Sequence, residues 1–444
     1  MPTLYESAAA SVQARERIRP HIYQTPLIPA KKIGQNCSAK VLFKAENFQL
    51  TGSFKVRGAM SKMSAQGQGR LITASSGNHG IGSALAAQSL SKNLTVVLPE
   101  TVIPAKLNKI KSYGVDVILH GAETGLAEQH AQKLASSGAY TYISPYNDPY
   151  IVAGQGTIGL ELLEQCNHID NIFISMGGGG LISGVGSVLK AFNPHIKVYG
   201  VSAIHSKALA TSMAAGHVVE TEHLPTIAEA VAGGIDEDTI TLGLASAVVD
   251  EVIECDEAEI KEGMKMLASS ESMIVEGAAA LALAGFNKIA QKLSGQTSVV
   301  LLCGANYDQD VFKQPANMPS DAPDETGRTS PWSEVSPPVM TPSGSSSPID
   351  EEKEFTLEVS ETAEVESNVH KATENEEENE HQGEIDGVGE ADDKVDDKVD
   401  DKTDDKTEDK TEDKTEDKTD DKTDDKTDDK TDDKTDDKTD DKTD

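Results

Sequence analysis

The sequence of 444 residues predicts an α/β fold with parallel-type sheets, followed by an acidic tail that has no core of its own. Across residues 1–314, short apolar segments typical of buried strands alternate with helix-like segments. From Gln314 onward, Pro, Ser, Asp and Glu dominate and apolar periodicity disappears. The alternation and the change in composition therefore separate an α/β body from a tail.

The first half of the body opens with a helix, because Ala8, Val12 and Ile18 are apolar at helical spacing and Thr25-Pro26 then breaks the pattern. Extended and helix-like runs follow in alternation. The expected elements are a helix from Tyr5 to Ile18, an extended segment at 40–46, a helix from Lys55, strands at 70–74, 94–98 and 115–119, and helices at 81–90, 104–113 and 122–136.

The pattern resumes after the turn-forming segment 144–149, whose two prolines interrupt it. The expected elements are helices at 156–165, 181–192, 256–269 and 277–284, and strands at 169–175, 198–202 and 298–302. We therefore expect two three-layer αβα domains. Residues 67–147 form a small domain, and residues 1–66 and 148–314 together form a large domain.

The tail carries most of the charge of the chain. Residues 321–444 contain 47 acidic and 16 basic residues, which is −31 of the total net charge of −35. From Asp392 the chain repeats Asp-Asp-Lys-Thr or close variants, and these units have no side chain that could build a core. We expect residues 315–444 to be disordered. A solvated charged helix is the alternative, but Thr or Val beside paired Asp disfavours it.

Composition excludes several classes of protein. The body has a net charge of only about −4, so no affinity for nucleic acid is expected. No signal peptide and no apolar run long enough to span a membrane is recognised. The four cysteines are far apart and form no CxxC pair, which disfavours a zinc site or a disulfide framework. These features favour a cytoplasmic protein.

The segment Thr51-Gly52-Ser53-Phe54-Lys55 joins an extended segment to a helix start. A lysine at this place lies near the positive end of the helix dipole and beside an aromatic ring, and both the dipole and desolvation lower its pKa. A lysine that is partly neutral can form a Schiff base with an aldehyde. The alternative is an ordinary surface lysine in a helix capped by Ser53.

Two further turns between a strand and a helix can bind anions. Gly177, Gly178, Gly179 and Gly180 allow consecutive N–H groups to point at one phosphate, and a helix N-terminus follows them. A flexible tight turn is the alternative. The second turn is Ser75-Ser76-Gly77-Asn78-His79-Gly80, which offers hydroxyl and N–H donors to a carboxylate. His79 is a candidate base, although a structural histidine is the commoner case.

Cys303 ends the last expected strand, where α/β sheets place ligand groups. Taken alone, it is better explained as a core cysteine.

Together these features resemble the fold-type II pyridoxal-phosphate enzymes, whose architecture is that of the tryptophan synthase β subunit. Within that group, the chain resembles the serine/threonine dehydratases (ammonia-lyases) and serine racemase. The resemblance covers residues 5–312. It rests on the segments already described and on the matching phrases Ala153-Gly154-Gln155-Gly156-Thr157, Pro225-Thr226-Ile227-Ala228 and Gly304-Ala305-Asn306.

The resemblance implies a role for each candidate residue. Lys55 would hold pyridoxal 5'-phosphate covalently, next to Phe54, and would serve as the base at the substrate Cα. The four glycines would bind the cofactor phosphate, Asn78 the ring hydroxyl, and Cys303 the ring nitrogen. Ser75, Ser76, Gly77 and Asn78 would bind the substrate carboxylate. Ser76 would also be the second catalytic residue if the protein racemises its substrate.

Several positions depart from the family pattern. Cys303 stands where serine is common, and a small neutral partner of the ring nitrogen suits prompt β-elimination. Ser202, Ser206 and Ala208 stand where serine racemase holds a cation, so no metal is expected. Leu50 replaces a lysine near the racemase nucleotide site, and Ala230 replaces a glycine near the ring. No regulatory domain follows the body, so feedback by isoleucine is not expected.

The resemblance implies a lyase that removes water from L-threonine or L-serine and releases ammonia with 2-oxobutanoate or pyruvate. The alternatives are serine racemase, a dehydratase of another β-hydroxy amino acid such as 3-hydroxyaspartate, and a non-catalytic interaction protein that acts through its acidic tail. The expected partners are a small amino-acid substrate and further copies of the chain, as a homodimer or a larger homo-oligomer.

Overall fold

Six strands form the larger sheet of the computed structural model, which describes residues 2–306. Their order is β1 (Leu27–Pro29), β2 (Lys40–Ala45), β10 (Thr297–Leu302), β7 (Asn171–Ser175), β8 (Lys197–Ala203) and β9 (Glu251–Cys255). Only β1 at the edge is antiparallel to its neighbour. Every residue of β7 and β10 is buried, as expected for central strands of a parallel sheet covered on both faces.

Four parallel strands form the smaller sheet, in the order β5 (Asp116–Leu119), β4 (Asn93–Leu98), β3 (Arg70–Ala74) and β6 (Thr141–Tyr142). All of them lie within residues 67–147, the segment expected to be a small domain. The exact domain boundaries stay a prediction, but the expected α/β fold with parallel-type sheets is confirmed. The expected tail, residues 315–444, lies outside the described residues.

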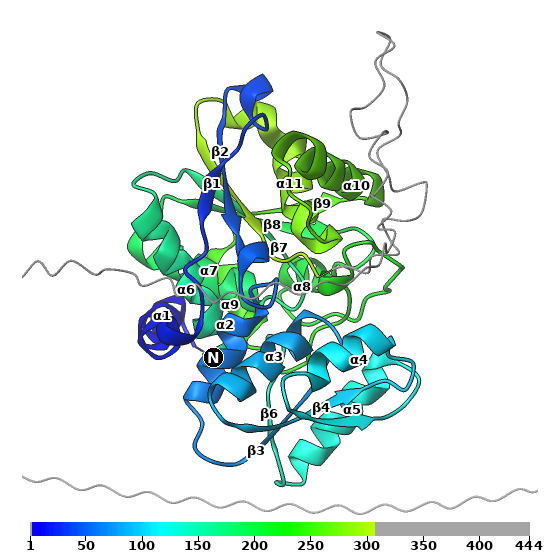
Figure 1. Ribbon diagram of the computed structural model, residues 1–444. Helices are drawn as coiled ribbons and strands as arrows, with labels where there is room; N and C mark the ends of the chain where they lie inside the picture. Colours follow the sequence, from blue (N-terminus) through cyan, green and yellow to red (C-terminus); the bar gives the residue numbers. More distant parts are fainter. Residues whose placement is uncertain (1, 307–444) are drawn as a thin grey trace, which may run out of the picture. The chain divides into compact units, whose positions relative to one another are not determined.

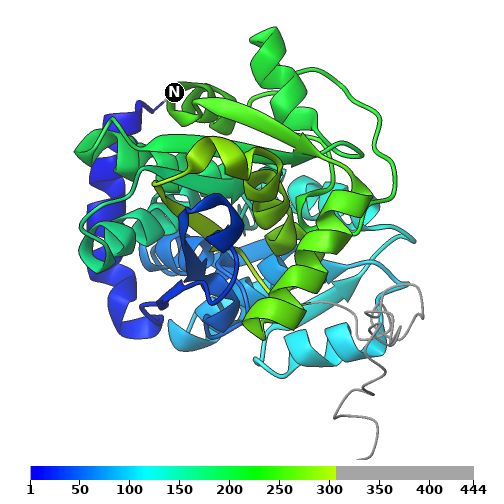
Figure 2. The same cartoon turned by 90° about the horizontal axis from the view of Figure 1, so that it is seen from above.

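Eleven α-helices accompany the sheets within the described residues, and Figure 1 shows α10 and α11 on one side of the larger sheet and α6 and α7 on the other. Seen from above, α1 lies at the periphery (Figure 2). The helices are α1 (Leu4–Ile18), α2 (Lys55–Ser64), α3 (Asn78–Ser89), α4 (Pro104–Lys111), α5 (Thr124–Ser136), α6 (Pro149–Gln165), α7 (Gly180–Phe192), α8 (Ala208–Ala215), α9 (Thr241–Val248), α10 (Glu257–Met266) and α11 (Gly277–Ile289).

Some boundaries differ from the sequence-based expectation for local reasons. Helix α6 begins at Pro149 rather than at 156, because Asp148 caps it by accepting from the N–H groups of Tyr150 and Ile151. Helix α10 ends at Met266 and continues as a π-turn over Leu267–Glu271. The sequence analysis missed α8, α9, β1, β6 and β9, which are eight residues long or shorter and carry weak periodicity.

Candidate active site

Lys55 is the first residue of α2, and its ammonium Nζ donates a hydrogen bond to the carbonyl oxygen of Pro145 at 2.8 Å. The same nitrogen lies 5.4 Å from the centroid of the Phe54 ring. Burial lowers the pKa of Lys55 to about 8, while Cys303 and Glu276 oppose the shift. Phe54 occupies the N-cap position and no side chain caps the helix, so Ser53 does not have the capping role considered above.

A pocket with an empty volume of about 500 Å³ opens beside Lys55. It brings together all eight residues that the sequence singled out for the cofactor, and it adds others, among them Tyr146 and Val231. The lining residues are Phe54, Lys55, Asn78, Pro145, Tyr146, Ser175, Gly177, Gly178, Gly179, Gly180, Leu181, Ile182, Ala230, Val231 and Cys303.

Ser75, Ser76 and Gly77 are not among the lining residues. They form the turn before α3, in which Gly77 is the N-cap residue and its N–H donates to the hydroxyl of Ser75 at 3.2 Å. Because Asn78 follows them directly and lines the pocket, these residues stand next to it. Their expected contact with the substrate carboxylate stays a prediction.

The turn between β7 and α7 has the properties of a phosphate cradle. The Cβ of any larger residue at Gly178 would lie 2.5 Å from ring carbons of Tyr146, and Gly179 has a φ of +86°. Among the described residues, no acceptor is found for the main-chain N–H groups of 177–180, which stand at the N-terminus of α7. Free amides at a helix N-terminus suit a phosphate, so these residues fit the cofactor's phosphate group.

Asn78 and Cys303 meet at a buried carboxylate that the sequence analysis missed. Asn78 Nδ2 donates to both oxygens of Glu276, at 2.9 and 3.0 Å, and Cys303 Sγ lies 3.8 Å from Glu276 Oε1. Burial raises the pKa of Glu276 to about 7, and it raises the pKa of the Cys303 thiol well above its ordinary value. The only hint in the sequence is a lone charge between the apolar segment 273–275 and the Ala-rich helix that follows.

The contacts of His79 favour a structural role over a catalytic one. Its Nε2 lies 2.9 Å from the hydroxyl of Thr73 and 3.0 Å from the carbonyl oxygen of Ile143. Burial, with a smaller effect of Lys55, lowers the pKa of His79 to about 3, so the ring is neutral at physiological pH. These contacts support the structural interpretation.

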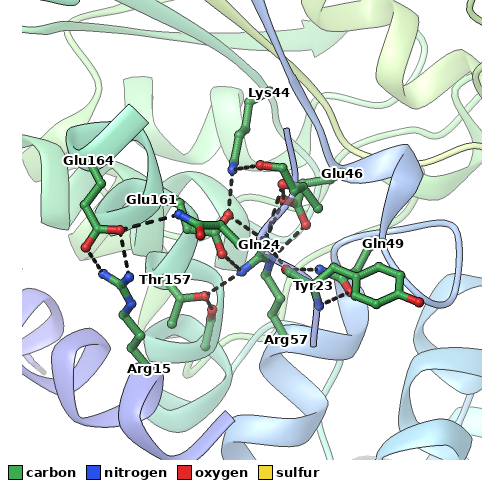
Figure 3. Close-up of polar contacts among 12 residues, drawn as sticks. Arg15, Tyr23, Gln24, Lys44, Glu46, Gln49, Arg57, Thr157, Glu161 and Glu164 are labelled. Carbon is green, nitrogen blue, oxygen red and sulfur yellow. Dashed lines mark hydrogen bonds and ion pairs between the residues drawn. The ribbon is translucent and has the colours of Figure 1, made fainter. Parts of the chain in front are cut away.

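A buried cluster of charged side chains contacts α2 through Arg57 (Figure 3). Arg57 is two residues after Lys55 and is fully buried. Its guanidinium bonds Glu46 through Nε and Nη2, both at 2.8 Å, and Glu161 through Nη1 and Nη2, at 2.6 and 3.0 Å. Lys44 Nζ completes the cluster at 2.5 Å from Glu161 Oε2. Two cations and two carboxylates thus balance their charges in a buried position.

The cluster ties the catalytic helix to elements on both sides of it. Glu46 follows β2, whereas Glu161 lies on α6, so Arg57 bridges two elements that are distant in sequence. Close packing supports the same contact, because a Cβ at Gly154 of α6 would lie 2.5 Å from the carbonyl oxygen of Arg57. The start of α2, and with it Lys55, is thereby fixed relative to the larger sheet.

One of the three positions considered for a cation, Ser206, is engaged in other contacts. The Ser206 hydroxyl lies 2.9 Å from His223 Nδ1 and accepts from the N–H of Gly233 at 3.0 Å. Among the described residues, no group of three or more His, Cys, Asp or Glu side chains is placed to hold a metal ion. Within residues 2–306, no helix combines the length and apolar character needed to cross a membrane.

The sequence profile of the family described as pyridoxal-phosphate dependent enzyme matches residues 18–304, which is more than half of the chain. The chain therefore belongs to this family, and its cofactor is pyridoxal phosphate.

The chain is similar to several characterised proteins. The catabolic L-threonine dehydratase TdcB of Staphylococcus aureus (strain N315) is 38% identical over 304 residues, covering 67% of this chain and 88% of that protein. The solved structure of the processed form of threonine deaminase isoform 2 from Solanum lycopersicum matches with a TM-score of 0.66 at 30% identity, covering 69% of this chain and 90% of that chain. Maize serine racemase matches with a TM-score of 0.65 at 30% identity, covering 70% and 96%. The resemblance stated from the sequence is confirmed.

Proposed function

We propose that the protein is a pyridoxal-phosphate-dependent ammonia-lyase that converts L-threonine to 2-oxobutanoate and ammonia, and L-serine to pyruvate and ammonia. The observation that carries this proposal is the meeting of Lys55, the glycine turn and a neutral Cys303 in one pocket. The 38% identity to a named L-threonine dehydratase supports the choice of substrate.

Each residue of the pocket has a separate role in the proposed reaction. When bound, the cofactor draws electrons from the bonds at the substrate Cα. Lys55, whose pKa of about 8 leaves part of the amine neutral near physiological pH, removes the proton from that carbon. The glycine turn and the N-terminus of α7 would hold the phosphate, while Asn78 and Cys303, which line the same pocket, would hold the ring. Loss of the β-hydroxyl as water and later hydrolysis release ammonia and the oxo acid.

Serine racemisation is the second candidate. It is supported by the match to maize serine racemase and by Ser76, which directly precedes the N-cap residue of α3. Racemisation requires a proton donor and acceptor on the second face of the substrate, and a serine hydroxyl next to the pocket is suited to that task.

We further propose a cytoplasmic protein that forms a homodimer or a larger homo-oligomer. Three large apolar side chains near the catalytic segment are exposed: Tyr23 at 56%, Phe48 at 52% and Leu50 at 41%. Exposed apolar groups of this size are typical of surfaces that associate.

The direct test is to incubate the purified protein with L- and D-forms of serine, threonine and 3-hydroxyaspartate. Ammonia, the oxo acid and the enantiomer of the remaining substrate are all measured. We expect oxo acid and ammonia in equal amounts from L-threonine and L-serine. Formation of D-serine without oxo acid would favour the racemase, and no turnover of any of these compounds would contradict both candidates.

A further inference from the structure

Glu276 is a carboxylate in an unusual setting. It is only 6% exposed, and among the described residues no Lys, Arg or His forms an ion pair with it. Another buried glutamate, Glu271, has three main-chain donors, because the N–H groups of Lys31, Lys32 and Ile33 bond its oxygens at 2.6, 3.0 and 3.0 Å. Glu276 accepts from the main-chain N–H of Asn306, and its side-chain donors are two residues that line the pocket, Asn78 and Cys303.

The contacts of Asn78 determine the orientation of its amide. On one side, Asn306 Nδ2 donates to Asn78 Oδ1 at 2.7 Å and to the carbonyl oxygen of Thr51 at 2.7 Å. On the other side, an ionised Glu276 can only accept. A flipped amide would set oxygen against carboxylate and nitrogen against nitrogen. Glu276 and Asn306 together therefore force the nitrogen of Asn78 toward Glu276.

This orientation leaves a donor for the pocket. Because Asn78 Nδ2 is nearly equidistant from both oxygens of Glu276, at 2.9 and 3.0 Å, one N–H can serve both of them. The second N–H is then available to a ligand in the pocket that Asn78 lines. A buried donor held in place before binding strengthens binding, because less order must be created when the ligand arrives.

We propose that Glu276 is a positioning residue, whose ionised carboxylate holds the Asn78 amide so that an N–H, not a carbonyl oxygen, faces the cofactor ring. This inference deepens the proposed function and rests on it, since it assumes that the pocket takes pyridoxal phosphate.

The orientation of the Asn78 amide should depend on pH, because it requires Glu276 to be ionised. The charged and titratable groups around the carboxylate are Lys55, which favours its ionised form, and the Cys303 thiol, which donates to it. Protonation turns one carboxylate oxygen into a donor, which no longer requires the nitrogen of Asn78 opposite it. Because burial raises the pKa of Glu276 to about 7, the orientation weakens as the pH falls below neutrality.

The first test is the affinity of the cofactor-free enzyme for pyridoxal phosphate, titrated by absorption from pH 6 to 9. Glu276→Gln should weaken binding about tenfold at pH 8, equivalent to about 1.4 kcal/mol. The ratio of wild-type to variant affinity should fall as the pH is lowered through 7. The affinity also increases with pH because Lys55 loses its proton, but that increase is common to both proteins and cancels in the ratio. Glu271→Gln is the matched control for the loss of a buried charge, and it should leave the affinity unchanged.

The second test asks whether Glu276 acts through Asn78. In a double-mutant cycle, Glu276→Gln should weaken cofactor binding tenfold when Asn78 is intact, but less than twofold in the Asn78→Ala background. If Glu276→Gln does not fold, Asn306→Asp is the substitute, because a carboxylate facing Asn78 Oδ1 disfavours the same orientation and should lower the affinity equally.

The results separate this inference from the proposed function, because no amino acid is needed. Unchanged affinity in Glu276→Gln, or equal losses in both backgrounds of the cycle, would overturn the positioning role even for an active lyase. A tenfold, Asn78-dependent loss would uphold it even if neither L-threonine nor L-serine were turned over.

Discussion

Replacing Arg57 by Met removes the centre of the buried charge cluster while keeping a side chain of similar length. The variant leaves Glu46, which is fully buried, with the Thr25 hydroxyl at 2.5 Å as its remaining side-chain partner. Glu161 keeps Lys44 at 2.5 Å. Glu46 is thus buried without a direct ion pair, whereas Glu161 is still paired.

The expected loss of folding stability follows from the single carboxylate that is left without its ion pair. Breaking one buried ion pair by removing a partner costs about 3–5 kcal/mol, because the abandoned charge stays out of water. We expect the free energy of unfolding of Arg57→Met to fall by about that amount at pH 7. The matched control is Arg15→Met, which breaks a partly exposed ion pair with Glu164 and should cost about 0–1 kcal/mol.

The pH dependence identifies the cause. Burial opposes ionisation of Glu46, but the charge and hydrogen bonds of Arg57 outweigh it and hold the pKa of this carboxyl below its ordinary value. The depressed folded-state pKa contributes stability above the unfolded value of about 4.3, and this stability is lost as the pH falls through the folded value. In the variant, only the charge of Lys44 and the hydrogen bond from Thr25 oppose the effect of burial, so the pKa of Glu46 should rise and acid should relieve the penalty.

The assay is urea unfolding at pH 7 and pH 4, with and without the cofactor. The difference between wild type and Arg57→Met should be largest at pH 7 and should shrink toward pH 4. A difference that is the same at both pH values would refute the electrostatic reasoning, and a loss below 1 kcal/mol would show that the cluster does not hold α2.

Three further predictions concern the pocket. Gly178→Ala places a Cβ 2.5 Å from the Tyr146 ring and should weaken cofactor binding more than tenfold by titration, whereas Gly125→Ala, with open space around it, should not. Cys303→Ser should keep most oxo-acid formation, and Cys303→Asp should raise the ratio of racemisation to elimination; a cofactor-loaded Asp variant with an unchanged ratio and spectrum would contradict contact with the ring nitrogen. The rate of cofactor capture by the cofactor-free enzyme should rise with pH through about 8, the pKa of Lys55, and a flat profile would contradict its role.

Local rules explain what the sequence revealed. Lys55 and the turn at 177–180 both stand where a strand gives way to a helix, and this setting is recognisable within a dozen residues. Cys303 was found because it directly follows the last strand, β10. The alternation of strands and helices likewise predicted the parallel sheets, since its signal is periodic and local.

Long-range contacts explain what was missed. Glu276 meets Asn78 across 198 positions, and Arg57 meets Glu161 across 104, so no pattern in the sequence joins them. Ser53 was considered as a cap, but no side chain caps α2, and Arg57 near its start bonds Glu46, a contact that no local pattern indicates. Short elements such as β9 were not predicted, because the hydrophobic pattern of a five-residue strand is too short to be distinguished from that of a loop.

The central claim is that Lys55 carries the cofactor, and borohydride reduction of the purified holoprotein tests it most directly. Reduction fixes the link between lysine and cofactor, and mass spectrometry of the digested protein then locates the added mass. The prediction is a modified peptide containing Lys55, absent in Lys55→Ala and retained in Lys44→Met, which replaces the buried lysine of the charge cluster. Modification of a different lysine, or a reducible link that persists in Lys55→Ala, would contradict the account.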